Sequence, residues 1–161
     1  LGHSKARLVG IDLLDTEGVV GANILTGDMT DPEMLEKVRL ATGGTADGVL
    51  SDMAADTTGH RATDHLRTTA LLEAALDFAI DVLNKNGFFL AKCFRGGAER
   101  ALLDVMQRNF KTTRHVKPAA SRAESVESYV LATGFHGSGR AEDIASDIAA
   151  GRRDADGALI I

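Results

Sequence analysis

The sequence predicts an α/β fold in which a Rossmann-like sheet carries one reversed strand at its edge. Short apolar runs alternate with longer segments of helical period as far as residue 110, a pattern typical of parallel strands joined by crossover helices. Two further strand-like runs then close the chain, and they indicate the reversed strand. A length of 161 residues, 44% of them apolar, is enough for one domain with a real core.

The spacing of apolar residues predicts the elements in order. We expect strands over 7–14 and 22–28, a helix over 32–41, a strand over 47–54, a polar loop over 55–63, a helix over 64–83, a strand over 88–94, a helix over 98–110, and strands over 112–117 and 127–134. The folded domain then spans residues 1–137. Residues 138–161 form a polar C-terminal tail with a weak helix over 141–150.

Helix boundaries are predicted from capping residues. Asp31 suits an N-cap and Pro32 suits the first helical position, so the first helix should begin there and end in the glycine-containing segment 42–45. Asp64 is the expected N-cap of the long second helix. Gly87 is expected to end that helix in the left-handed conformation.

Composition excludes several classes of protein. The formal charge is −5 and the pI is near 5.5, which argues against a generic nucleic-acid coat protein, although a local basic face is compatible with it. Cys93 is the one cysteine, so neither a disulfide framework nor a structural zinc cluster is expected, and His60 and His65 lack metal-site spacing. Without a long apolar run or a signal peptide, the chain is expected to be soluble and cytoplasmic.

Three acids stand at successive strand ends, where ligands collect in sheets of this class. Asp12, Asp28 and Asp52 lie at the carboxyl ends of the first three predicted strands. Each alone is most simply a solvated cap residue. Together they would repel one another unless they face donors such as ribose hydroxyls or an exocyclic amine, so they favour a nucleoside-like ligand.

Lys92 is the unusual residue of the apolar strand 88–94. An ammonium in such a run is disfavoured unless it is paired or reaches a polar cleft. Asp52, one strand over, is a candidate partner, and a partly desolvated lysine can act as a base or steer a hydroxyl nucleophile. The simpler alternative is a side chain that snorkels to the sheet edge.

The segment 117–129 mixes basic, hydroxyl, acidic and aromatic residues before the last strand. A surface loop is the plain interpretation. The functional one is a substrate lip, in which Lys117 and Arg122 contact phosphates, Tyr129 lies near a base or ribose, and Glu127 points toward Lys92.

Together these motifs resemble the FtsJ/RrmJ (RlmE) family of S-adenosylmethionine-dependent 2'-O-methyltransferases, which act on a uridine ribose of 23S ribosomal RNA. The likeness runs in order from about residue 2 to residue 137. The segments that carry it are Asp12-Leu13-Leu14, Leu25-Thr26-Gly27-Asp28, Leu50-Ser51-Asp52-Met53-Ala54, Ala91-Lys92-Cys93-Phe94 and Ser121-Arg122-Ala123-Glu124-Ser125-Val126-Glu127-Ser128-Tyr129.

The resemblance implies a role for each matching residue. Asp12 would hold the cofactor ribose, Asp28 with Met29 the adenine, and Asp52 the methionine end of the cofactor. Lys92, Asp52 and Glu127 would form the catalytic set. Ser125 and Tyr129 would lie near the RNA. The implied partner is 23S ribosomal RNA or the large ribosomal subunit. The resemblance also implies a monomer that binds neither a metal nor a membrane.

The chain departs from the family at its start. The family opens with a basic stretch that contains a further catalytic lysine, then a strand and a glycine-rich cofactor loop, and none of these occurs within the 161 residues. The resemblance places that strand between the strands ending at Asp12 and Asp52. Two alternatives remain open: an inactive cofactor- or RNA-binding module for ribosome assembly, and a nicotinamide-dependent oxidoreductase on a similar sheet.

Overall fold

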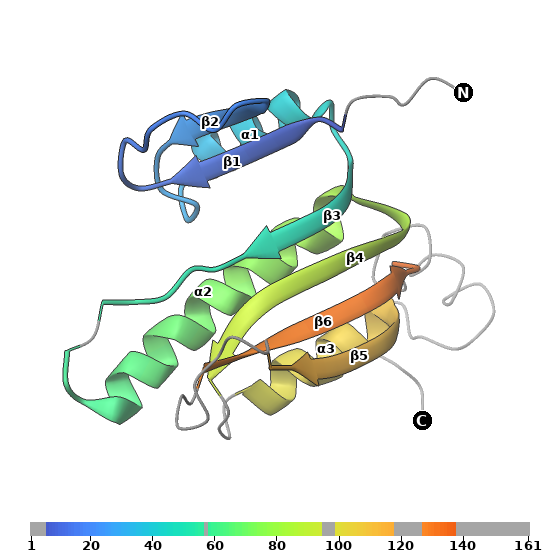
Figure 1. Ribbon diagram of the computed structural model, residues 1–161. Coiled ribbons are helices and arrows are strands. Elements are labelled where there is room, and N and C mark those ends of the chain that lie inside the picture. The colour runs from blue at the N-terminus through green and yellow to red at the C-terminus, as the bar shows by residue number, and fades with distance from the viewer. Residues whose placement is uncertain (1–5, 57, 95–98, 118–126, 138–161) are drawn as a thin grey trace.

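The computed structural model describes residues 6–56, 58–94, 99–117 and 127–137. Within these ranges three helices and six strands follow one another (Figure 1). They are β1 (Leu8–Asp12), β2 (Ala22–Thr26), α1 (Pro32–Thr42), β3 (Ala46–Ser51), α2 (Arg61–Val82), β4 (Leu83–Phe94), α3 (Glu99–Asn109), β5 (Phe110–Val116) and β6 (Glu127–Phe135). The predicted order of strands and helices is confirmed. The predicted helix over 141–150 lies outside the described residues.

The strands form two sheets. β1 and β2 pair in parallel, and the larger sheet has the order β3-β4-β6-β5. β4 is parallel to β3, whereas β6 is antiparallel to both of its neighbours. The expected reversed strand is therefore β6. It lies inside the sheet rather than at the edge, because β5 pairs with its outer side.

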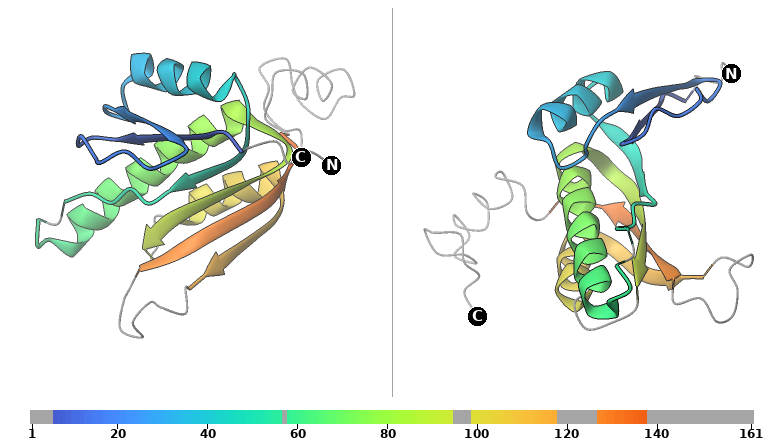
Figure 2. Two further views of the ribbon diagram at one scale, coloured as in Figure 1. Left: turned by 45° about the horizontal axis from the view of Figure 1, so that its top comes forward. Right: turned by 90° about the vertical axis from the view of Figure 1, so that its left-hand side faces the viewer.

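Helices α2 and α3 cover one face of the larger sheet, and no described helix covers the other face (Figure 2). Strand alternation sends every second residue of β4 toward the helices. Phe89, Ala91 and Cys93 are accordingly buried in the main core. The residues between them in sequence lie on the open face, which is where a polar side chain of β4 can reach solvent.

A cavity of about 710 Å³ separates β1 from β3. The two strands run in the same direction on either side of it (Figure 1), yet they belong to different sheets. Its wall is largely apolar and includes Val9, Ile11, Val38, Val49 and Phe88. The sheet is thus divided at the position where the family resemblance places a further strand.

Helix α1 has the ends that its sequence predicts. The Asp31 side chain accepts a hydrogen bond from the backbone N–H of Glu33, and the proline occupies the first turn. At the other end Gly43 is left-handed, with φ of 83°. These caps supply partners for backbone groups that a helix cannot satisfy internally.

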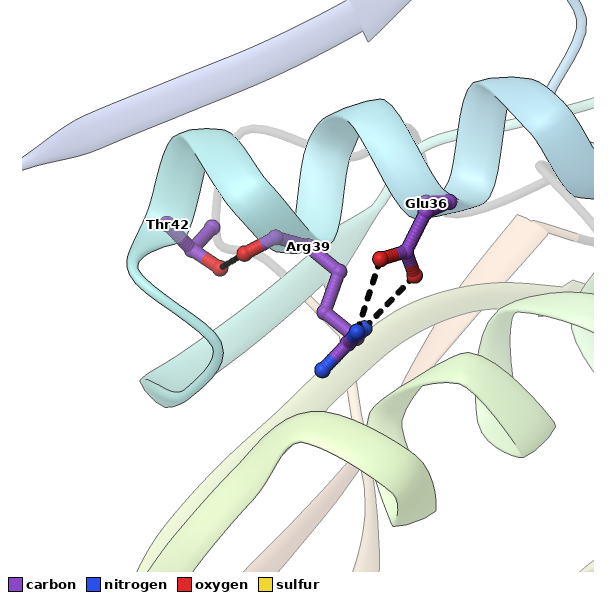
Figure 3. Close-up of polar contacts among 3 residues, drawn as sticks. All are labelled: Glu36, Arg39 and Thr42. Atoms are coloured by element: carbon purple, nitrogen blue, oxygen red, sulfur yellow. Dashed lines mark hydrogen bonds and ion pairs between the residues drawn. The ribbon is translucent and has the colours of Figure 1, made fainter.

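The last turn of α1 also carries a local ion pair (Figure 3). Two guanidinium nitrogens of Arg39 each lie 2.7 Å from a different carboxylate oxygen of Glu36, and the Thr42 hydroxyl donates to the Arg39 carbonyl at 2.8 Å. The pair is about half exposed, so solvent screening leaves it little effect on helix stability.

The start of α2 differs from its prediction. The helix begins at Arg61 with His60 at the N-cap, so Asp64 lies in its first turn instead of capping it. The Asp64 carboxylate turns back to the preceding loop, where it accepts bonds from the Thr58 N–H and hydroxyl at 2.8 and 2.6 Å. A first-turn acid can satisfy donors of the entering loop as readily as those of the helix itself.

The end of α2 also corrects a prediction. The helix stops at Val82 and β4 begins directly, and the left-handed residue is Asn86, with φ of 67°, rather than Gly87. Gly87 is required for a different reason, because a Cβ there would lie 2.8 Å from the Asn84 carbonyl oxygen. Asparagine tolerates the left-handed region better than most residues, so Asn86 can adopt the conformation that was predicted for Gly87.

Replacement of Gly43 by alanine should lower the free energy of unfolding by about 1 kcal/mol, because an L side chain at φ of 83° is strained. Urea denaturation measures the change. Gly18→Ala is the matched control, since a Cβ at Gly18 meets nothing within 4 Å and its φ is not in the left-handed region. Equal stability of the two variants would contradict the assigned cap.

Candidate functional site

Three neighbouring strands bring one acid, one amine and one phenol together. Asp52 directly follows β3, Lys92 lies in β4 and Tyr129 lies in β6. The register pairs Ser51 with Ala91, and Lys92 with Tyr129. Asp52 and Tyr129 are therefore on the two sides of Lys92, near the carboxyl end of β3.

The Asp52 carboxylate is the centre of this cluster. Lys92 Nζ lies 3.0 Å from Asp52 Oδ1, and the Tyr129 hydroxyl donates to the same oxygen at 2.8 Å. The Lys92 side chain is only 14% exposed, whereas that of Asp52 is 72% exposed. The predicted pairing of Lys92 with Asp52 is confirmed.

The two donors determine the charge state of Asp52. Partial burial alone would raise the pKa of this carboxyl, but the hydrogen bonds from Tyr129 and Lys92, together with the Lys92 charge, outweigh burial and lower the pKa below its ordinary value. Asp52 is therefore an anion at neutral pH. It provides a fixed negative charge beside the amine.

Strand alternation explains why a lysine occurs in the apolar run of β4. Cys93 is 3% exposed in the core, and its Sγ lies 3.3 Å from the Ser128 hydroxyl, also buried. Lys92 is on the opposite face, which no described helix covers. The aliphatic part of the Lys92 side chain lies against the sheet while its ammonium reaches Asp52. The alternative prediction, that this side chain snorkels to the sheet edge, is therefore wrong.

Asp12 and Asp28 lie at the carboxyl ends of the paired strands β1 and β2, as predicted. The two strand ends are joined by a bond of 2.8 Å from the Gly27 N–H to the Asp12 carbonyl. Asp12 Oδ1 accepts from the Leu14 N–H at 2.9 Å. Both acids are exposed, which leaves carboxylate oxygens accessible to a ligand.

Asp28 is held more firmly than Asp12. The N–H and the hydroxyl of Thr30 donate to Asp28 Oδ1 at 2.8 and 2.7 Å, and these bonds lower the pKa of Asp28. Met29 is half-buried and packs against the apolar cluster beneath α1. An acid that is ionised and fixed is a good acceptor for hydroxyl or amine donors.

The structure describes the remaining predicted site residues only in part. Glu127 begins β6, with its backbone opposite Phe94, and its side chain lies outside what the structure describes. Lys117 is exposed just after β5. Arg122 and Ser125 lie outside the described residues.

Two contacts were not anticipated from the sequence. Tyr129 was expected beside a base or ribose, but its hydroxyl meets Asp52. The contact of Thr30 with Asp28 is not among the predictions, although a hydroxyl residue two positions after an aspartate is a recognised turn pattern that indicates it. The Tyr129 contact has no local signal, because it depends on strand order.

In the described part of the chain, histidines, cysteines and acids do not gather in a group of three or more that could hold a metal ion. None of the helices in the same ranges combines the length and hydropathy of a membrane span.

Comparison with known families gives a match over most of the chain. Residues 1–135 match the family model described as FtsJ-like methyltransferase. Among solved structures, a ribosomal RNA methyltransferase of Plasmodium falciparum superimposes with a TM-score of 0.69 over 80% of this chain and 72% of its own. Identity in that pair is 20%, so this likeness concerns the fold, a Rossmann-like methyltransferase sheet.

Curated relatives are much more similar in sequence. The protein named ribosomal RNA large subunit methyltransferase E of Sinorhizobium fredii is 56% identical over 136 residues, which are 84% of this chain and 56% of the relative. Its namesake in Gluconobacter oxydans is 55% identical over 80% of this chain and 48% of its own. That of Mesorhizobium japonicum is 50% identical over 94% and 60%. The chain thus spans about half the length of the relatives it matches.

Asp52→Asn should destabilise the protein at pH 6, and this effect should shrink as the pH falls below the unfolded pKa of the carboxyl and through its lowered folded pKa. A carboxyl whose pKa is lowered on folding contributes stability above its unfolded pKa, about 3.9, and this contribution is lost as pH falls through the folded pKa. Exposure limits the effect to about 0.5 kcal/mol. Urea unfolding at several pH values measures it.

Asp77→Asn is the control of opposite sign. Burial, followed by the charges of Glu73 and Asp81, raises the pKa of Asp77, so its ionised form is unfavourable in the folded state. This variant should therefore be more stable than the wild type at pH 6 and should converge with it as pH falls below about 4. A shift of the same sign in both variants would contradict the assigned electrostatics.

Proposed function

Because the chain belongs to the FtsJ-like methyltransferase family, we propose that its protein uses S-adenosylmethionine to methylate the 2'-oxygen of a uridine ribose in 23S ribosomal RNA. The observation that carries the proposal is the contact of Lys92 with Asp52 beside the carboxyl ends of the parallel strands, within the matched residues. The names of the relatives support ribosomal RNA of the large subunit as the substrate. A cytoplasmic location and action as a monomer belong to the same proposal.

The residues present fit a nucleoside cofactor. Asp12 and Asp28 are exposed carboxylates at adjacent strand ends, and ribose hydroxyls and an adenine amine are donors of the kind they accept. We assign the cofactor ribose to Asp12 and the adenine to Asp28 with Met29. Asp52, at the end of β3, is assigned to the methionine end of the cofactor.

S-Adenosylmethionine supplies a methyl group on a sulfonium, which needs little further activation. The protein therefore has two tasks, to align the ribose 2'-oxygen with that methyl group and to manage its proton. Lys92 aligns the 2'-oxygen through a hydrogen bond. It then either accepts the proton as a neutral amine, or stabilises the developing negative charge as an ammonium while the proton leaves to water. Asp52 holds the amine in place from β3.

We assign Glu127 to the same catalytic set. It lies two residues before Tyr129 in β6, the spacing at which a strand repeats its face. A second acid near Lys92 would help to retain its charge or accept its proton. Lys117, Arg122, Ser125 and Tyr129 are assigned to the RNA side of the site, where cations meet phosphates and hydroxyl or aromatic groups meet ribose and base.

We further propose that residues 1–137 are part of a methyltransferase domain whose sheet has another strand between β1 and β3. Two unpaired sheet edges beside an apolar cavity of about 710 Å³ support this, since unpaired buried backbone groups are costly. The strand would come from a part of the protein outside these residues, as would the glycine-rich cofactor loop. Residues 138–161, the predicted polar C-terminal tail, are not part of this proposed domain.

Lys92→Ala should lower methyl transfer to ribosomal RNA at least 100-fold, roughly the contribution of a positioned acid or base, while binding of S-adenosylmethionine changes little. The assay uses the complete protein, large-subunit particles and cofactor with a labelled methyl group, followed by mapping of the methylated nucleotide. Lys85→Ala is the matched control, because Lys85 is an exposed lysine of the same strand.

Wild-type turnover in Lys92→Ala would reject the assignment of the lysine. An inactive wild-type protein that still binds particles and cofactor would favour the ribosome assembly module instead. Binding of a nicotinamide cofactor in place of S-adenosylmethionine would favour the oxidoreductase.

A further inference from the structure

The phenol of Tyr129 takes part in an ion pair between two other strands. Its hydroxyl donates to Asp52 Oδ1 at 2.8 Å, the atom that Lys92 Nζ approaches at 3.0 Å. A side chain expected to face RNA is thus directed at the carboxylate that holds the lysine.

Tyr129 is anchored on both sides of its strand. Its backbone pairs with Lys92 of β4 and with Val116 of β5. The residues next to it in β6, Ser128 and Val130, are 2% and 1% exposed. The phenol therefore projects from one of the most constrained positions of the sheet.

Asp52 has much less support of its own. It lies one residue beyond the end of β3, and its side chain is 72% exposed. An exposed carboxylate outside a strand can adopt several rotamers, and only some of them face Lys92. One salt bridge at such an exposed acid is weak at holding a single geometry.

The distance that the phenol spans restricts which kind of residue in β6 can hold the Asp52 carboxylate. β4 lies between β3 and β6, so the backbones of Asp52 and Tyr129 are about 10 Å apart at the usual strand spacing. A long, rigid side chain with a terminal donor bridges that distance above Lys92. The neutral hydroxyl fixes Asp52 without adding a second positive charge that would compete with the lysine.

We propose that Tyr129 is a positioning residue, which clamps the Asp52 carboxylate so that Lys92 is presented to the ribose hydroxyl. The inference rests on the proposed methyl transfer. The aromatic ring of Tyr129 keeps its assignment to the RNA side of the site, and the hydroxyl is assigned to the catalytic pair. Tyr129 acts through Asp52 and is not itself a catalytic residue.

Tyr129→Phe tests the inference because it removes only the hydroxyl. In the complete protein, kcat for methyl transfer should fall about 10-fold, the effect of losing one hydrogen bond to a charged group, with KM for RNA and cofactor unchanged. Thr133→Val is the matched control. It removes a hydroxyl from the same strand, where Thr133 Oγ1 lies 2.6 Å from Thr112 Oγ1 away from the site, and its kcat should equal that of the wild type.

A second readout does not depend on activity. NMR titration of carbon-13-labelled aspartate side chains should show the midpoint of Asp52 at higher pH in Tyr129→Phe than in the wild type or Thr133→Val, because a bond to the ionised form is lost. This measurement decides the contact even if the wild-type protein transfers no methyl group, a result that would reject the proposed function separately.

Wild-type kcat and an unchanged Asp52 titration in Tyr129→Phe would overturn the inference. A raised KM for RNA with kcat unchanged would also overturn it, in favour of a direct RNA contact. A lower kcat together with a higher Asp52 titration midpoint in Tyr129→Phe supports the clamp when Thr133→Val changes neither quantity. A merely structural defect would not produce both changes.

Discussion

An ammonium on a sheet strand is tolerated only where it is paired or reaches water, and the pairing of Lys92 with Asp52 meets that requirement in this fold. The Lys92 side chain is 14% exposed, so most of it lies against the sheet, and the acid is supplied by the neighbouring strand. The same contact links the ends of β3 and β4 on the face that the helices leave open. The candidate site depends on it, because Tyr129 donates to the same carboxylate and completes the cluster around this pair.

The two faces of the larger sheet have different roles. One face packs against α2 and α3 and contains the main core, including Phe89, Ala91 and Cys93. The other carries Lys92 and Tyr129 toward Asp52. Because adjacent residues of one strand serve both faces, the rigid core fixes the positions of the polar groups, as a site that must hold a precise geometry requires.

Much of this arrangement could be predicted from local sequence. Apolar periodicity located all the described strands and helices, and the capping pattern at Asp31 located the start of α1. The Lys92–Asp52 contact was predictable because parallel neighbours place their carboxyl ends together. Strand order was harder: the reversed strand β6 lies inside the sheet, and the reach of Tyr129 across β4 follows only from that order. The prediction of Asp64 as the N-cap of α2 is wrong because an acid near the start of a helix can accept hydrogen bonds from the preceding loop instead.

The central claim is that Lys92 and Asp52 line the site of methyl transfer. The most direct measurement is a crystal structure of the complete protein with S-adenosylhomocysteine bound. The account predicts the nucleoside end of that ligand at Asp12 and Asp28, and its sulfur on the open face of the sheet beside Asp52 and Lys92. A ligand bound away from these strand ends, or a Lys92 amine separated from its sulfur by the sheet, would contradict the account.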